Sequence, residues 1–351
     1  MNALHNALAA IDAQPGDDDR TLLAKAKARA QITGYNHRYA GAGYTPTAIE
    51  QEFHLPIVNP CTGHPSKNFQ QAGRIDAEVI APSGECHNLD HKTTSMDIAD
   101  PAAVYWRQLA VESQVSMYAL ACWQQSRKVD GSVWDVIRKP SIRPAKLTKA
   151  DTKAIGDGEY HGYPITAEDW EYAQAVGREN AHLYECRLTR DCLDRPLHYY
   201  QRRTVPRLDS EMLSWAEELW VVAKDIRETQ IRAMSCEKPE TAWFRNSGAC
   251  MNYGTPCEYL GLCSGSETAD NGLWEIRERP HEELSVACDE SRWCILTHSS
   301  IRCYATCRRK AYYRYELRLR RLDEEEKEAT FYGTLIHVGL NAWWQTFVEE
   351  K

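Results

Sequence analysis

Three charged residues in two short segments have the types and the spacing that metal-assisted hydrolysis of a phosphodiester requires. Asp76 lies in the segment GRIDAEVI, and Asp90 and Lys92 form an Asp-x-Lys triplet in the segment LDHKTT. Two converging carboxylates can bind Mg²⁺ or Mn²⁺, and the ion lowers the pKa of a bound water and neutralises charge on the phosphate. A neighbouring lysine can orient that water. Because an Asp-x-Lys triplet is common by chance, a surface strand with an ion pair is the alternative interpretation.

The elements that must position these residues are two strands and a turn. Residues 73–80 alternate between polar and apolar side chains, as a strand does, and residues 86–93 are typical of a second strand. Between them, the sequence Pro-Ser-Gly at 82–84 predicts a tight turn. In such an antiparallel hairpin, the carboxylates of Asp76 and Asp90 can converge on one cation.

Neighbouring side chains of the second strand point to opposite faces. Lys92 therefore shares a face with the aspartate of the triplet, whereas His91 points away and offers a metal only its backbone carbonyl. An amphipathic helix is predicted over 103–126, and it carries Gln114 and Tyr118 four residues apart on one face. The same spacing also occurs where a helix merely places one residue in the core and one at its rim.

Together these segments resemble the PD-(D/E)XK nuclease superfamily, and within it the RecB-like and Cas4-like branch. A strand Asp, then (D/E)-x-K, then Q-x-x-x-Y mark that branch, as in GRIDAEV, LDHKTTS and QVSMY here. The resemblance implies an α/β, restriction-endonuclease-like fold with a mixed β-sheet core flanked by helices, a helical insertion and a cysteine-ligated cluster. It also implies a metal-dependent DNA nuclease, an exonuclease, acting in recombination, repair or phage and CRISPR-type DNA processing. The catalytic residues it implies are Asp76, Asp90, Lys92, Gln114 and Tyr118.

A histidine near the end of the sequence is similar to a metal ligand of this branch. The family carries a G-x-x-x-H motif on a helix, and the segment from Gly333 to His337 matches it. The resemblance implies that His337 is the third protein ligand of the ion, with Asp76 and Asp90. Since apolar residues surround His337, a core histidine is the alternative.

Thirteen cysteines are present, an odd number that does not favour a framework of disulfides. Many members of the branch bind an iron–sulfur cluster through four cysteines, and the matching positions here are Cys250, Cys257, Cys263 and Cys307. The resemblance implies a [4Fe–4S] cluster, although Arg308 stands where the family usually has proline. A zinc site is less favoured, because C-x6-C-x5-C lacks short zinc knuckles.

The motif order departs from the family, because the early cysteine and the histidine close this chain instead of preceding the strands. The resemblance covers residues 45–140, 240–263 and 299–349 in permuted order. Three explanations remain: a circular permutation, which we favour because each motif occurs once; a domain swap with a neighbouring copy; and the start of a truncated second domain.

A basic and aromatic segment at 302–321 predicts contact with nucleic acid. The residues expected to bind DNA are Arg308, Arg309, Lys310, Arg314 and Tyr312. The alternative is a solvated helix face balanced by the acidic residues 323–328.

Composition bounds the remaining possibilities. The formal net charge is −8 and 43% of the residues are hydrophobic, which excludes disordered and collagen-like classes. With no signal segment and no run of about 18 apolar residues, we expect a cytoplasmic protein that does not interact with a membrane. No phosphate-binding loop is present, so unwinding would need a helicase or recombination partner or frayed, single-stranded DNA. The alternative function is a catalytically inactive iron–sulfur module that binds nucleic acid, and RNA is not excluded.

The remaining patterns complete the expected organisation. Helices are predicted over 3–12, 21–39, 208–234, 299–321 and 329–349, one helix near 167–187 within a loop-rich stretch at 140–205, and strands over 47–56 and 131–138. We expect a nuclease core at 1–140, a helical insertion at 141–240, a cysteine segment at 241–263, a connector at 264–298 and the permuted opening segment at 299–351.

Overall fold

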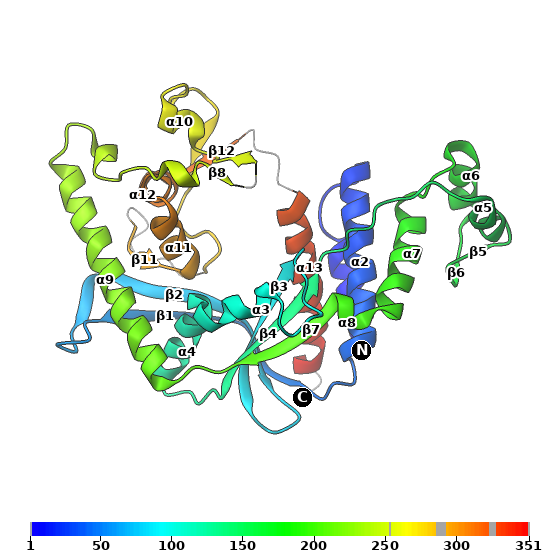
Figure 1. Ribbon diagram of the computed structural model, residues 1–351, viewed down its shortest axis with the longest axis horizontal. Coiled ribbons are helices and arrows are strands. Elements are labelled where there is room, and N and C mark those ends of the chain that lie inside the picture. Colours follow the sequence, from blue (N-terminus) through cyan, green and yellow to red (C-terminus); the bar gives the residue numbers. More distant parts are fainter. Residues whose placement is uncertain (1, 253, 286–292, 323–327, 350–351) are drawn as a thin grey trace.

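The computed structural model describes residues 2–252, 254–285, 293–322 and 328–349 (Figure 1). Residues 323–327, most of the acidic run that the alternative interpretation sets against the basic segment, lie outside them. The elements are α1 (Ala3–Asp12), α2 (Asp19–Tyr39), β1 (Thr45–Val58), β2 (Pro65–Ile80), β3 (Cys86–Thr94), α3 (Val104–Gln108), η1 (Leu109–Val111), α4 (Ser113–Gln124), β4 (Gly131–Arg138), α5 (Lys149–Gly156), β5 (Glu159–Tyr160), β6 (Tyr163–Pro164), α6 (Ala167–Val176), α7 (Ala181–Asp194), α8 (Pro196–Tyr199), β7 (Tyr200–Val205), α9 (Asp209–Met234), η2 (Pro239–Thr241), η3 (Ser247–Ala249), β8 (Met251–Asn252), β9 (Thr255–Pro256), α10 (Leu260–Ser264), β10 (Trp274–Ile276), β11 (Ile295–Leu296), α11 (His298–Thr306), α12 (Arg308–Ala311), the π-helical turn η4 (Tyr312–Glu316), β12 (Leu319–Arg321) and α13 (Glu328–Glu349).

A mixed sheet forms the centre of the molecule. Its order is β1-β2-β3-β4-β7, with β11 pairing β2 in addition. The hairpins β1–β2 and β2–β3 are antiparallel, β3 and β4 are parallel, and β7 returns antiparallel to β4. Six consecutive residues of β4, Ser132–Ile137, are buried, as expected for a central strand covered on both faces.

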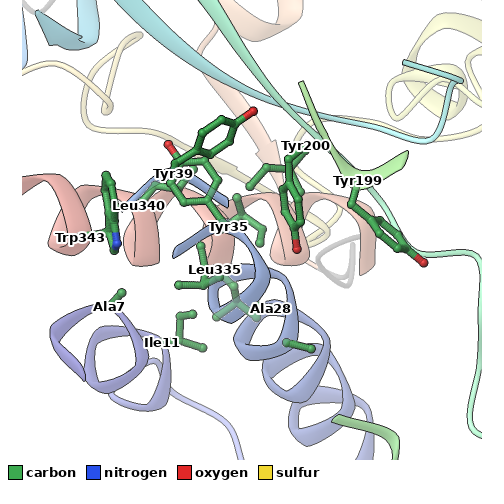
Figure 2. Packing of buried hydrophobic residues seen from close by; sticks show 14 of the residues in the cluster. Ala7, Ile11, Ala28, Tyr35, Tyr39, Tyr199, Tyr200, Leu335, Leu340 and Trp343 are labelled. Atoms are coloured by element: carbon green, nitrogen blue, oxygen red, sulfur yellow. The ribbon is translucent and has the colours of Figure 1, made fainter. Parts of the chain in front are cut away.

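Helices α1, α2 and α13 cover one face of the sheet and form the largest core (Figures 1 and 2). Alanines such as Ala7 and Ala28 allow the helices to approach closely, and Leu335 and Leu340 of α13 fill the space between them. Burying each leucine stabilises the fold by about 1.5–3 kcal/mol. Residues at opposite ends of the sequence therefore share one core.

The opposite face packs against α4 and α9. Phe53 of β1 and Ile75 of β2 contact a cluster that includes Met117, Leu219 and Ile226. The same cluster continues into a small lobe, which we call the cysteine lobe, made of residues 239–276 and 298–321. In Figure 1, α9 runs along one side of the molecule from the sheet to this lobe.

Strands β2 and β3 separate at what we call the β2–β3 fork. Their pairing extends from Ile80↔Cys86 only as far as Ala77↔Leu89. Beyond the fork, β3 stays paired with β4, whereas β2 takes β11 as a parallel neighbour at Gln70 and Gln71. Among the described residues, β2 therefore has no strand partner on this side between Gln71 and Ala77.

Several expected elements are confirmed, including the terminal helices, the long helix α9 and the strand at 131–138. The single helix predicted over 103–126 is wrong, because it is interrupted at 109–111. There the side chain of Glu112 accepts a hydrogen bond from the backbone N–H of Gln114 and starts α4 as a separate helix.

The helix predicted near 167–187 is also two helices. The first ends at Gly177, which has a φ of 69°, and Asn180 caps the second. The stretch 140–205 holds four helices in all, and its last segment, β7, belongs to the central sheet.

The helix predicted through 299–321 was wrong at its C-terminal end. It breaks at Cys307, whose backbone is extended, and continues as a short helix, the π-helical turn and the strand β12. The connector at 264–298 contributes β10, which pairs with β12, and β11, which joins the sheet.

Candidate active site at the strand fork

The fork places Asp76 against the backbone of β3. Just past the last β2–β3 pair, the N–H of His91 donates a hydrogen bond of 2.7 Å to Asp76 Oδ2. This bond replaces the strand pairing that the fork interrupts. The first predicted carboxylate is thereby held beside the Asp-x-Lys triplet.

Asp90 and Lys92 form an ion pair at the fork between Oδ2 and Nζ. Asp90 is only 2% exposed, and its burial, opposed by Lys92, raises its pKa to about 6. Burial would lower the pKa of Lys92, but Asp90 and Asp76 raise it, so the ammonium stays charged. Lys92 also lies 5.1 Å from the centre of the Trp134 ring, which favours the cation.

Gln114 and Tyr118 connect the two sides of the fork. Gln114 Nε2 donates to Asp90 Oδ1 at 3.1 Å and to the Tyr118 hydroxyl at 2.9 Å. The hydroxyl in turn donates to the carbonyl of Arg74 on β2 at 2.8 Å. The chain of bonds therefore runs from Asp90 on β3, through α4, to the residue two before Asp76.

His337 reaches the fork from α13. Its Nδ1 lies 3.8 Å from Asp76 Oδ2. Gly333, one turn before His337, faces β3, where a Cβ would lie at an ordinary contact distance of 3.8 Å from Thr93. Desolvation, opposed by Asp76, lowers the pKa of His337 to about 4, so the imidazole is neutral at pH 7 and retains a lone pair for a metal.

Two carboxylates and one neutral imidazole thus lie at the fork, and the carboxylate oxygens among these donors suit Mg²⁺ or Mn²⁺. Within the described residues, no group of three or more His, Cys, Asp or Glu side chains is close enough to hold a metal ion. The fit of these residues to a divalent cation therefore rests on the chemistry of the donor atoms and on the contact between Asp76 and His337.

The comparisons with known proteins identify the family of the chain. A family model of the PD-(D/E)XK nuclease superfamily matches residues 2–264 and 295–351, which is most of the chain. The chain belongs to the PD-(D/E)XK nuclease superfamily. No curated protein and no solved structure matches it.

Membership in the PD-(D/E)XK superfamily supports a metal-dependent nuclease and therefore a nucleic-acid substrate. The expected architecture is confirmed at this level, because a mixed sheet flanked by helices is consistent with that fold. Every helix in the described parts of the chain is too short or too polar to span a lipid bilayer.

The side chain of His91 points to the face of the sheet opposite the Asp90–Lys92 pair. Its Nδ1 lies 3.1 Å from Asp135 Oδ2, and its ring centre lies 6.3 Å from that of Trp344. Residue 91 therefore faces the site with its backbone N–H, which contacts Asp76.

Sequence reasoning missed Asp135. This carboxylate is fully buried, and Arg202 Nε donates to it at 3.1 Å. The signal was a single acidic residue within the apolar strand GSVWDVIR. Its partner on β7 is 67 residues away along the chain, so no local pattern could have identified it.

The four predicted cluster cysteines line one cavity in the cysteine lobe. Cys250, Cys257, Cys263 and Cys307 all contribute to its wall, and its volume is about 1670 Å³. Burial raises the pKa of Cys257 and of Cys263. Cys303, which lies four residues before Cys307, is not part of the wall, and burial raises its pKa to about 11.

Two of the arginines predicted to bind DNA contact neighbouring elements. Arg308 Nη2 lies 2.6 Å from Asp225 of α9, and Arg309 Nε donates to the Trp243 carbonyl at 2.9 Å. These contacts attach α12 to α9 and to the rest of the cysteine lobe.

The other predicted DNA-binding residues also have intramolecular partners. Lys310 and Arg314 share the carboxylate of Glu258 at 3.0 and 3.5 Å, and the ring of Tyr312 lies 5.7 Å from that of Trp243. Lys310 and Arg314 nevertheless line the cysteine-lobe cavity. Any contact with DNA would therefore compete with these internal partners.

Proposed function

We propose that this protein is a Mg²⁺- or Mn²⁺-dependent DNA nuclease of the RecB-like and Cas4-like kind, acting as an exonuclease. The observation that carries the proposal is the position of His337, 3.8 Å from Asp76, beside the Asp90–Lys92 pair. Asp76 of β2 contacts both His337 of α13 and the backbone of β3 next to Asp90, and the superfamily match supports a nuclease.

The proposed roles follow from these contacts. Asp76, Asp90 and His337 would hold the ion, and the backbone carbonyl of His91 remains a candidate further ligand. When bound, the ion supplies a water of lowered pKa and neutralises charge on the phosphate. Lys92 remains charged and lies beside Asp90, so it can orient the attacking water.

Gln114 and Tyr118 position other groups and do not need to contact the DNA. The amide of Gln114 already donates to Asp90 and to the hydroxyl of Tyr118. We therefore assign both side chains to keeping the carboxylate and the β2 backbone in register.

We propose that the permuted motif order is a circular permutation. In Figure 1, α13 lies beside α1 and α2 of the same chain, and the three helices share one core. This packing supports a C-terminal segment that completes the fold of its own chain. It argues against a domain swap, in which the segment would complete a second copy.

We also propose that the four cavity cysteines bind a [4Fe–4S] cluster, with zinc as the less favoured occupant. All four line the same cavity, and Lys310 and Arg314 beside them would offset the charge of thiolates. The cluster would join 250–263 to α11 and α12.

The substrate, we propose, is DNA with single-stranded or frayed ends, supplied by a helicase or recombination partner. Recombination, repair and phage or CRISPR-type processing all require such a nuclease.

One experiment tests the activity. Anaerobically purified protein is incubated with end-labelled single- and double-stranded DNA in Mg²⁺, Mn²⁺ or EDTA, together with Asp76→Asn and Lys92→Ala. The control is Lys128→Ala, whose side chain is 90% exposed. We expect mononucleotides or short products from the wild type and the control only. Equal cleavage by Asp76→Asn would contradict the proposal, and DNA binding without cleavage would favour an inactive binding module.

A further inference from the structure

A charged pair beside Asp76 has no role in the chemistry described above. Arg74 precedes Asp76 by two residues in β2, so both side chains leave the strand on the same side. Glu50 of β1 lies opposite Asp76, between the pairs Ile49↔Ala77 and Gln51↔Ile75. Arg74 Nε lies 2.6 Å from Glu50 Oε2, which places a guanidinium next to the candidate metal ligand.

This pairing is diagonal across the strands. The residue directly opposite Arg74 is Glu52, but the carboxylate of Glu52 accepts hydrogen bonds of 3.0 Å from the N–H of Ser285. Arg74 therefore turns to Glu50, which is two positions nearer to Asp76. The connection is within the reach of diagonal neighbours in an antiparallel pair.

The backbone of Glu50 has a φ of 53°, in the left-handed region. A residue other than glycine adopts this conformation at a cost, and such positions concentrate at functional sites. Here the unusual conformation occurs at the residue that orients a guanidinium toward the fork.

The backbone of Arg74 is fixed by a hydrogen bond, whereas its side chain is exposed. Its carbonyl accepts the hydrogen bond of Tyr118, so its Cα is fixed relative to Asp90. The side chain is 44% exposed. Among the described residues, its nearest ion-pair contact joins Nε to Glu50, and a guanidinium has two terminal nitrogens that can donate to the paired oxygens of a phosphate.

Binding an anionic phosphate beside the acidic side chains of the fork requires a cation. Asp76, Asp90 and Glu50 are acidic, and Lys92 is already paired with Asp90. Arg74 is therefore the cation at the fork that can accept a second, anionic partner without leaving its first.

We propose that Arg74 binds a backbone phosphate of the substrate DNA beside Asp76, and that Glu50 holds the guanidinium in the orientation for this contact. The proposal rests on the proposed nuclease function and deepens it, because it assigns the residue that positions the substrate. Arg74 is the contact residue, and Glu50 is a positioning residue.

The test measures binding separately from cleavage. Anisotropy of a labelled single-stranded oligonucleotide is recorded in Ca²⁺, over a series of salt concentrations, for the wild type, Arg74→Ala, Arg74→Lys and Glu50→Gln. The matched control is Arg143→Ala, an exposed arginine of the insertion. Mn²⁺ affinity by calorimetry and kcat with KM are measured on the same proteins.

For Arg74→Ala we expect binding about tenfold weaker or more, and a slope of log Kd against log salt reduced by about one. Mn²⁺ affinity should stay at the wild-type value. Arg74→Lys should recover the salt slope but not kcat, because an ammonium lacks the paired donors. Glu50→Gln should keep the salt slope and lower kcat.

Each other outcome has a defined meaning. Wild-type Kd, salt slope and kcat in Arg74→Ala would overturn this proposal while leaving the nuclease function intact, and so would a loss of Mn²⁺ binding in that variant. If Arg74→Ala fails to fold, Arg74→Lys decides, and wild-type kcat in that variant overturns the proposal. A wild-type protein that neither binds nor cleaves DNA refutes the proposed function, and the role of Arg74 falls with it.

Discussion

The imidazole of His91 lies 3.1 Å from the carboxylate of Asp135, while the N–H of the same histidine donates to Asp76. Asp135 also accepts a hydrogen bond of 2.5 Å from Tyr35 of α2 and pairs with Arg202 of β7. Burial would raise the pKa of Asp135, but Arg202, His91 and Tyr35 outweigh it and lower the pKa to about 2. A buried network that joins α2 and β7 therefore ends at the candidate metal site.

The first prediction concerns this network. Asp135→Asn removes the charge that compensates Arg202 and should reduce the free energy of unfolding by about 3–5 kcal/mol, measured by urea denaturation. It should also weaken Mn²⁺ binding, because His91 loses its partner. Asp157→Asn, at an exposed aspartate, should change stability by less than about 0.5 kcal/mol. Equal stability of the two variants would show that the network contributes nothing.

The second prediction concerns the third ligand. His337→Ala should lower Mn²⁺ affinity by at least about tenfold, since it removes the imidazole beside Asp76. Calorimetry measures this effect without DNA. His64→Ala, at an exposed histidine, is the control. Unchanged affinity in His337→Ala would remove α13 from the metal site.

The third prediction is a pH dependence of metal binding. The pKa of Asp90 is raised to about 6, so below that pH a proton occupies the carboxylate that a cation needs. Mn²⁺ affinity should fall by about tenfold per pH unit below pH 6 and level off above it. His337 titrates near 4 and does not contribute in this window. Asp90→Asn should bind weakly and without this dependence, and a wild type whose affinity is constant across pH 6 would contradict the assignment.

The same raised pKa has a consequence for stability. The ordinary value for this carboxyl is 3.8, so between pH 4 and 6 the folded protein retains a proton that the unfolded chain has lost. In metal-free protein, the contribution of Asp90 to the free energy of unfolding should therefore decrease as the pH rises through this range. Chemical denaturation of the wild type and Asp90→Asn at both ends of the range measures the difference, which should be largest above pH 6.

The fourth prediction separates two neighbouring cysteines. Cys307→Ser should lose iron and acid-labile sulfide after anaerobic purification, because Cys307 lines the cavity shared by the other three cysteines. Cys303→Ser is the matched control, four residues earlier, and should retain both. Zinc in place of iron in the wild type would identify the less favoured site, and equal iron content in the two variants would contradict the assignment of Cys307.

Local patterns predicted the strands that carry the acids but not the way in which the sheet closes around them. The alternation in GRIDAEVI and the apolar run GSVWDVIR each lie within an observed strand. The two-residue strand β11, in contrast, exists only because it pairs with β2 where β3 has left. A segment that short carries no periodicity of its own.

The site was predicted in part for the same reason. Asp76, Asp90 and Lys92 are close in sequence, so hairpin geometry could bring them together. The approach of His337 came from a family resemblance, because no periodicity relates positions 261 residues apart (337 − 76). The pair Glu50–Arg74 was missed because a left-handed residue inside a strand leaves no trace in its side-chain type.

Helix α13 contributes to both the core and the site, since Leu335, Leu340 and Trp343 pack against α1 and α2 while His337 reaches Asp76. A growing polypeptide that has emerged only as far as the cysteine lobe would already contain Asp76, Asp90 and Lys92 but not the imidazole of His337. In the nuclease that we propose, activity would therefore arise during synthesis only after residues 328–349 pack against the rest of the fold. Incomplete chains would then not cleave nearby DNA.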